Sequence, residues 1–255
     1  MGRDGRLFIP SDRGGGWLIE SVRQLKAEML RLSAHFRDQD RYRQAAAKYL
    51  VTELSHCTFE KAWLINVDRP VYFRRVGQHR DVLDTAGSLS DGGRFNIGGA
   101  QASSRATEQL GAFCGKRSAL YLGENAAIVR MEYGDFGMPG ATAITHSVSL
   151  KRRAKLNLID IGAALNSLAP QIPDLKAMVG NASMNGKWVD IKYPMPCQIL
   201  GHWLIANAPK KTEGIRFPTT HAAGGWNVCL FFADTRACKQ LLKAAASNSS
   251  SVAAL

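Results

Sequence analysis

Leu120-Tyr121-Leu122-Gly123-Glu124 stands a few residues ahead of Val129-Arg130-Met131-Glu132. A short apolar run that ends at glycine is typical of a strand, so we expect a strand over residues 118–123. Residues 125–133 are interpreted as a helix that comes directly after it. This strand–helix segment holds Tyr121 and Glu132 eleven positions apart. Core packing does not require these residue types at this spacing, which favours an enzyme.

The same pattern extends outward on both sides of this segment. After Asp68-Arg69-Pro70, short apolar runs alternate with glycine-rich turns, which predicts further strands near Val71–Val76, Thr142–Ser149 and Val228–Phe232. Helices are expected at Ser103–Phe113, Ile161–Leu168 and Pro196–Ala208. Strands and helices mix without a regular βαβ rhythm, which favours an α+β fold with a mixed sheet over a doubly wound one.

The first 66 residues carry a helical pattern. Apolar residues at steps of three and four from Trp17 to about Phe36 predict an amphipathic helix, and a second helix is expected over Arg41–Leu54. The apolar stripe either packs on the main domain or serves as a dimer or partner surface. We divide the chain into an N-terminal helical extension (1–66), a main domain (67–243) and a flexible, serine-rich tail (244–255).

Composition describes a basic globular protein. The 255 residues are 45% hydrophobic and carry a formal net charge of +12. Residues 1–60 hold ten Lys and Arg against eight Asp and Glu, so ten of the twelve surplus positive charges lie in residues 61–255. Such a field attracts polyanions, among them nucleic acids, phosphorylated metabolites and anionic membranes. Charge alone does not choose among these partners.

Several classes of site lack their motifs. Five cysteines without a two-residue spacing indicate a reduced, cytoplasmic setting. No apolar run reaches the roughly 20 residues that span a bilayer, so we expect no membrane segment. The six histidines are scattered, which predicts no metal site. Dinucleotide-fold, Walker, zinc-protease and serine-hydrolase motifs are also missing, as are helix-turn-helix and zinc-finger signatures.

Three motifs in a fixed order do form a pattern: Phe73-Arg74, then Gly92-Gly93-Arg94-Phe95-Asn96, then Tyr121 and Glu132. The pattern continues through Gly214-Ile215-Arg216-Phe217-Pro218-Thr219 to Gly224-Gly225-Trp226-Asn227. From Val67 to Asp234 the chain thus resembles the RES family, the toxins of RES–Xre toxin–antitoxin pairs. The chain departs from that family in having Phe95 for tryptophan, Thr219 for serine and an insertion between Asn96 and Tyr121.

The resemblance implies an ADP-ribosyltransferase-like fold, NAD⁺ as a substrate and no resident cofactor. It also implies an antitoxin or immunity protein as partner, and frequently a toxin homodimer. An acidic partner would suit the positive charge, since complementary fields speed encounter. The residues themselves show none of these partners.

Cleavage of the nicotinamide–ribose bond leaves an oxocarbenium-like centre that a carboxylate stabilises. The resemblance implies a Tyr and a Glu eleven residues apart, as Tyr121 and Glu132 are, which selects Glu132 over Glu124 for this role. An arginine fork can clamp the pyrophosphate, which suits Arg74 first and Arg94 second. Strand alternation points Arg75 to the other face, so a one-residue shift would exchange it with Arg74. Tyr121 can stack on nicotinamide. Further substrate contacts are predicted at Gly93, Asn96 and Thr219.

Three hypotheses stay open at this point. The first is a toxin that cleaves NAD⁺ and passes ADP-ribose to water or phosphate. The second keeps the same site but transfers ADP-ribose to a macromolecule, a mono-ADP-ribosyltransferase activity. The third is a non-enzymatic nucleic-acid-binding module, which only the charge supports. Sequence cannot separate the acceptors, because all of them attack the same carbon.

Overall fold

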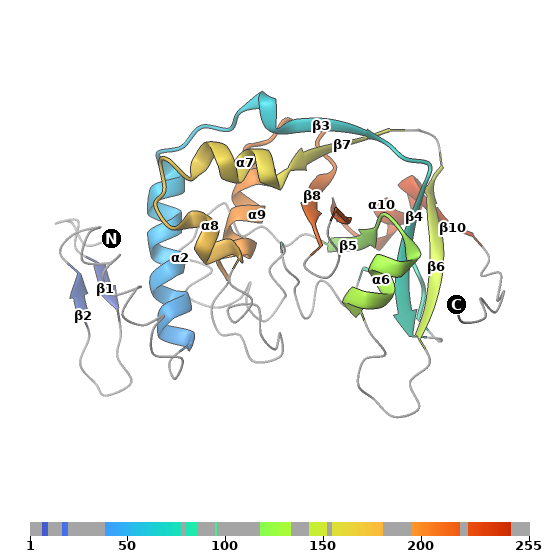
Figure 1. The fold of residues 1–255 in the computed structure, drawn as a ribbon, viewed down its shortest axis with the longest axis horizontal. Coiled ribbons are helices and arrows are strands. Elements are labelled where there is room, and N and C mark those ends of the chain that lie inside the picture. The colour runs from blue at the N-terminus through green and yellow to red at the C-terminus, as the bar shows by residue number, and fades with distance from the viewer. Residues whose placement is uncertain are drawn as a thin grey trace. The chain divides into compact units, whose positions relative to one another are not determined.

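A computed structural model describes residues 7–9, 17–19, 39–77, 80–85, 95, 118–133, 143–151, 155–180, 195–219 and 224–245 of the chain. The chain forms two compact units, drawn together in Figure 1. The first contains Met1–Glu60, Ser88–Lys116 and Ala164–Ala208. The second contains Lys61–Gly87, Arg117–Ala163 and Pro209–Leu255.

The first unit is mainly helical. Its core is α9 (Pro196–Asn207), against which α2 (Gln39–Ser55) and α8 (Leu175–Gly180) pack. All residues from Pro196 to Ile205 of α9 are buried, as expected for a helix that is enclosed on every side. A two-stranded sheet pairs β1 (Leu7–Ile9) with β2 (Trp17–Ile19) in the same unit.

The second unit is built on an eight-stranded mixed sheet in the order β10-β6-β4-β5-β9-β8-β7-β3. Neighbours are antiparallel except β7 and β8, which are parallel. The sheet twists, so that β3 and β7 run across the view of Figure 1 while β4 and β6 run down it. The strands are β3 (Leu64–Asp68), β4 (Val71–Gly77), β5 (Ser118–Gly123), β6 (Ala143–Leu150), β7 (Lys155–Asp160), β8 (Gly214–Pro218), β9 (Trp226–Phe232) and β10 (Leu242–Ala244). A 3-10 turn, η1 (Lys61–Trp63), precedes β3.

The two faces of this sheet carry different side chains. One face, here the Tyr72 face, carries the buried apolar core formed by Tyr72, Leu120, Leu122, Val148, Val228 and Leu230. Helix α10 (Thr235–Leu241) packs on this face, and its Cys238 is part of the buried core. Because side chains alternate along a strand, the opposite face carries Phe73, Arg75, Tyr121, Phe217 and Asn227, and we call it the Tyr121 face.

Most of the predicted elements are confirmed, and the α+β class with them. Helix α2 matches the second predicted N-terminal helix, and β4, β5, β6 and β9 match the predicted strands. Helices α6 (Ala126–Tyr133), α7 (Ile161–Leu168) and α9 match their predictions within two residues. The predicted helix Ser103–Phe113 lies outside the described residues.

Two predictions were wrong at an element boundary. Trp17–Ile19 is a strand paired with Leu7–Ile9, whereas the apolar spacing predicted the start of a helix. The rest of that predicted helix lies outside the described residues. Ala244, placed at the start of the flexible tail, pairs with Val148 in the sheet. In both cases strand pairing overrides a local pattern.

Candidate active site

Tyr121 stands near the middle of the sheet, on β5. Its ring meets the ring of Phe217 edge-on, with the centroids 6.5 Å apart. Tyr121 also forms a hydrogen bond with Cys229, which lies directly opposite it on β9. Burial raises the pKa of the Cys229 thiol to about 12, so the thiol stays neutral, and the bond to Tyr121 acts weakly against that shift. The phenol is therefore held in a fixed position on its face.

Helix α6 lies directly on this face, and Gly123 permits it. A Cβ atom at Gly123 would lie 2.3 Å from Cγ2 of Val129, so any side chain there would push the helix away. The side chain of Asn125 accepts a hydrogen bond from the backbone N–H of Ile128 at 2.8 Å and fixes the start of the helix. Glu132 lies in α6, one turn after Val129. The structure thus brings the strand of Tyr121 and the helix of Glu132 into contact.

Thr219 lies just beyond β8, beside the start of α6. Its backbone N–H donates to the carbonyl of Gly225 at 3.0 Å. A Cβ atom at Gly225 would lie 2.6 Å from both Cδ1 of Ile128 and Cγ2 of Thr219, so these two side chains converge on one point. The structure therefore places Thr219 next to the segment that carries Tyr121 and Glu132.

Asn227 is a further candidate site residue. It ends the Gly224-Gly225-Trp226-Asn227 motif, but the sequence alone did not single it out for a role. It lies opposite Gly123 and Phe217 on the Tyr121 face and is 1% exposed. Among the residues that the structure describes, neither its amide nitrogen nor its amide oxygen has a hydrogen-bond partner. An unpaired buried amide costs stability, and such groups in native proteins often mark a functional position.

The structure does not bring Arg74 to Tyr121. Phe73 pairs with Gly123, so Phe73 shares the face of Tyr121, and Arg74 points to the Tyr72 face. There Nη1 of Arg74 donates to the carbonyl oxygens of Val82 and Asp84, the second at 3.0 Å. Arg75 is the arginine on the Tyr121 face, where its Nη1 donates to Oγ1 of Thr145 at 3.5 Å. The register favours Arg75 as the arginine nearer to Tyr121.

Glu124, the other glutamate considered for the catalytic role, forms ion pairs with two arginines. Its carboxylate pairs with Nε of Arg216 at 3.1 Å and with Nη2 of Arg69 at 3.5 Å, and its side chain is 11% exposed. Arg69 also donates to the backbone carbonyl of Glu124 at 2.6 Å, and the guanidinium of Arg216 stacks on Trp226 at 3.9 Å. Two cations thus hold one nearly buried anion, so the Glu124 carboxylate is engaged in ion pairs.

Tyr72 lies beneath this ion-pair cluster. Burial raises its pKa to about 12, with a further contribution from the negative charge of Glu124. Its hydroxyl is buried and has no hydrogen-bond partner within the described part of the chain. Glu124, Arg69 and Arg216 are far apart in the chain, so no local motif could have indicated the cluster.

Of the Gly92–Asn96 motif, Phe95 lies within the described residues. It is 1% exposed and packs in the first unit against α9. A Cβ atom at Gly201 would lie 2.6 Å from the carbonyl oxygen of Phe95 and 2.9 Å from its Cβ. The motif is therefore anchored at its aromatic residue. Gly93, Arg94 and Asn96 lie outside the described residues.

This anchor predicts the effect of Gly201→Ala. Alanine in a helix interior is favoured over glycine by about 1 kcal/mol, but the clash with a backbone oxygen costs about 1–3 kcal/mol. We expect a net loss of stability, measured as a lower midpoint in urea unfolding. Gly180→Ala in α8 is the matched control, because no described residue lies within 4 Å of its Cβ position. A Gly201→Ala protein as stable as wild type would contradict the contact.

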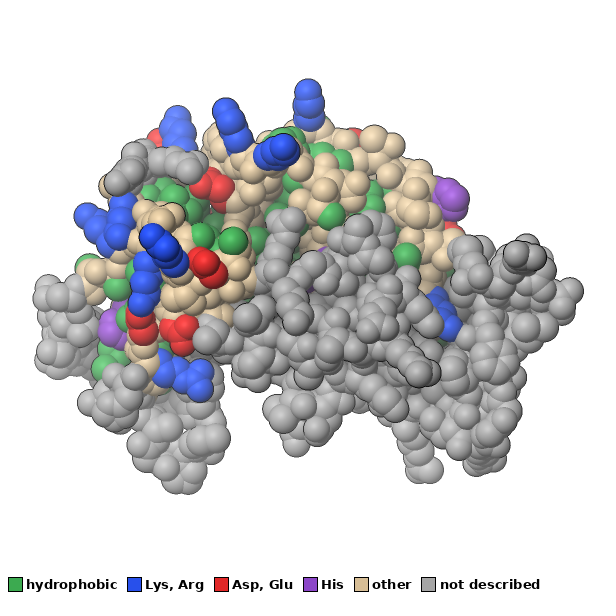
Figure 2. All heavy atoms as spheres, turned by 180° about the vertical axis from the view of Figure 1, so that it is seen from behind, with side chains coloured by type: hydrophobic (Ala, Val, Ile, Leu, Met, Phe, Trp, Pro, Cys, Tyr) green, Lys and Arg blue, Asp and Glu red, His purple; other side chains and the backbone are tan. Residues whose placement is uncertain are grey.

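The described residues have the following metal-ligand, membrane and surface-charge features. Within the described ranges, no three His, Cys, Asp or Glu side chains gather as metal ligands. None of the described helices is long and apolar enough to cross a bilayer. On the face seen in Figure 2, some of the Lys and Arg side chains lie beside acidic ones.

Comparisons with known proteins bear on the family. Residues 62–249 match the RES domain. Among solved structures, the chain is similar to the crystal structure of the M. tuberculosis MbcT–MbcA toxin–antitoxin complex, with 19% sequence identity and a TM-score of 0.42 over 77% of this chain and 91% of that chain. The search of curated proteins gives no match. Since the domain match covers well over half of its residues, the chain belongs to the RES domain family.

Proposed function

We propose that this protein is a toxin that cleaves the nicotinamide–ribose bond of NAD⁺, at a site on the Tyr121 face of the sheet. The observation that carries the proposal is the contact between β5 and α6 at Gly123, which joins the strand of Tyr121 to the helix of Glu132. Membership of the RES family supports the same substrate. Thr219 and Asn227 lie on the same side of the sheet and complete the candidate site.

The proposed reaction needs one negative charge beside the ribose and several contacts that hold NAD⁺ in place. The C–N bond breaks with its electron pair leaving on neutral nicotinamide, and the ribose becomes oxocarbenium-like. The carboxylate of Glu132 stabilises this positive centre. The ring of Tyr121 stacks on the nicotinamide, and an arginine of β4 or Arg94 binds the phosphates. An oxygen of water or phosphate then forms the new bond to the same carbon.

The first test is direct. Purified protein is incubated with NAD⁺ in buffers with and without phosphate, and free nicotinamide is measured by chromatography. We expect nicotinamide release. The second product is ADP-ribose when water is the acceptor and ADP-ribose 1″-phosphate when phosphate is the acceptor. Release that requires an added macromolecule, which becomes labelled, would assign the transferase activity instead. No release under any of these conditions would contradict the proposal.

We further propose an acidic antitoxin as the partner. Exposed lysines of the second unit include Lys151, Lys239 and Lys243, and most of the surplus positive charge lies after residue 60. Complementary charge would speed the encounter, and the rate would fall as salt rises. Co-purification with the product of the adjacent gene tests this. The absence of a complex at micromolar concentrations would count against it.

A further inference from the structure

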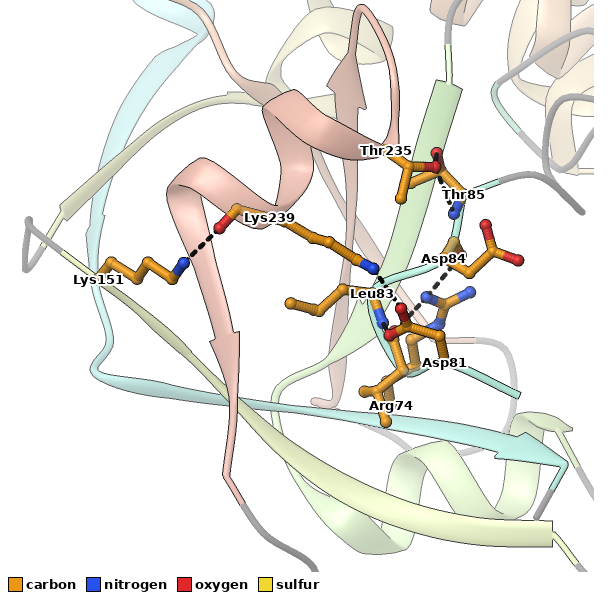
Figure 3. Close-up of polar contacts among 9 residues, drawn as sticks. Arg74, Asp81, Leu83, Asp84, Thr85, Lys151, Thr235 and Lys239 are labelled. Atoms are coloured by element: carbon orange, nitrogen blue, oxygen red, sulfur yellow. Dashed lines mark hydrogen bonds and ion pairs between the residues drawn. The ribbon is translucent and has the colours of Figure 1, made fainter. Parts of the chain in front are cut away.

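We propose that Arg74 is a positioning residue, which together with α10 holds residues 81–85 in place and serves the reaction through that segment. The inference rests on the proposed function for its kinetic consequence. It differs from the expectation drawn from the motif, in which Arg74 binds the substrate. Figure 3 shows the contacts that support it, with Arg74 and Lys239 approaching the segment from different elements.

The first hold on the segment comes from β4. Nη1 of Arg74 donates to the carbonyl oxygens of Val82 and Asp84, which lie two residues apart in the loop after the strand. A guanidinium suits this task because its donors are fixed in a plane and it stays charged. Val82 and Leu83 are buried in the core of the Tyr72 face, the same face as Arg74. Arg74 therefore holds the backbone of the segment at the point where the side chains of Val82 and Leu83 enter the core.

The second hold comes from α10. Oγ1 of Thr85 lies 2.7 Å from Oγ1 of Thr235, and the backbone N–H of Thr85 donates to the same oxygen at 3.4 Å. Thr85 is completely buried, so its hydroxyl has no access to water in place of Thr235. Asp234 stabilises the start of α10 by accepting a hydrogen bond from Ala237 at 2.7 Å. A helix 150 residues away in sequence thus anchors the end of the segment.

The third hold is weaker. Nζ of Lys239 forms an ion pair with Asp81, and both side chains are about half exposed. This bond holds the pKa of Asp81 below its usual value. Oδ1 of Asp81 also accepts from the backbone N–H of Leu83 at 2.9 Å. Because exposed ion pairs are screened by water and salt, we assign the main effect to Arg74 and Thr235.

The segment matters because it leads into the Gly92–Asn96 motif. Residues 81–85 are the last described residues of the second unit before the chain enters Ser88–Lys116 of the first. That stretch carries the motif, and Arg94 comes nine residues after Thr85. Holding Thr85 therefore fixes the point from which the chain leaves the second unit toward the stretch that carries the motif. Loss of either anchor releases the same constraint.

The test is a double-mutant cycle. Arg74→Gln, Thr235→Val and the double variant are compared for nicotinamide release from NAD⁺. We expect kcat to fall about tenfold in each single variant and about tenfold in the double variant, because both side chains act on one segment. If Arg74 bound substrate, the effects would multiply to about a hundredfold and KM would rise with Arg74→Gln alone; that result would overturn the proposal. Thr52→Val in α2 is the matched control, since that hydroxyl bonds only within its own helix.

A second readout does not depend on activity. Hydrogen exchange of a peptide that covers residues 80–87 is expected to become faster in both single variants, with the rest of the sheet unchanged. Unchanged protection in Arg74→Gln would overturn the proposal. If exchange rises but the wild-type protein releases no nicotinamide, the anchoring role holds and the proposed function fails.

Discussion

Glu132→Gln is expected to lower nicotinamide release from NAD⁺ by at least about 10²-fold while leaving the thermal midpoint of unfolding unchanged. Glutamine has nearly the size of glutamate but no charge, so the variant removes the electrostatic stabilisation of the oxocarbenium-like ribose and little else. Loss of one preorganised electrostatic group at a reacting centre commonly costs about 10²–10³ in kcat. The measurement is the initial rate of nicotinamide release at saturating NAD⁺, with the unfolding midpoint from circular dichroism.

Glu124→Gln supplies the contrast. Its carboxylate holds Arg216 and Arg69, so the variant is expected to lose about 1–3 kcal/mol of stability and far less activity than Glu132→Gln. Asp68→Asn, an exposed carboxylate of β3, serves as the control for a change of charge alone. The reverse order of the two rates, with both proteins folded, would move the chemistry to Glu124.

Local sequence patterns were enough to predict β5, α6, α7 and α9. Each is a continuous run rich in apolar residues, such as Leu120 and Leu122 on β5 or the wholly buried stretch Pro196–Ile205 of α9. The pattern was not enough for β8 and α10. Strand β8 is five residues long and ends at Pro218, and α10 has seven residues, so each repeats its period only about twice and gives a weak signal.

The choice between Arg74 and Arg75 shows where sequence reasoning stops. Alternation along β4 indicates that the two arginines point to opposite faces, but it does not indicate which of them shares a face with Tyr121. That information lies in the register, in which Phe73 pairs with Gly123. Register depends on residues some 50 positions away, so the sequence of β4 alone leaves both options open.

The ion-pair cluster around Glu124 could not be predicted for a related reason. Arg69 and Arg216 are 55 and 92 residues from Glu124; Arg69 lies between β3 and β4, and Arg216 lies in the middle of β8. Arginine and glutamate are common surface residues, so their types carry no signal by themselves. Only the order of the sheet, which places β4, β5, β9 and β8 side by side, brings these chain segments together.

Gly123→Ala is expected to have the largest effect of any single-methyl change in the site. The added Cβ would lie 2.3 Å from Cγ2 of Val129, a buried side chain whose rotamer in a helix is nearly fixed, and 3.2 Å from Oδ1 of Asn227. Helix α6 must therefore move away from β5, at a cost of about 1–3 kcal/mol. Glu132 moves with the helix, and a misplacement of about 1 Å can cost roughly 10²-fold in rate.

Gly77→Ala in β4 separates this clash from the general effect of replacing glycine. Nothing lies within 4 Å of the Cβ position at Gly77, so alanine there should stabilise the protein by about 0.4–1 kcal/mol by restricting the unfolded chain. The two variants are thus expected to shift the thermal midpoint in opposite directions, by about 2–4 °C for each kcal/mol. If Gly123→Ala behaved like Gly77→Ala in both midpoint and rate, β5 and α6 would not be in close contact, and the site would lose the feature that joins Tyr121 to Glu132.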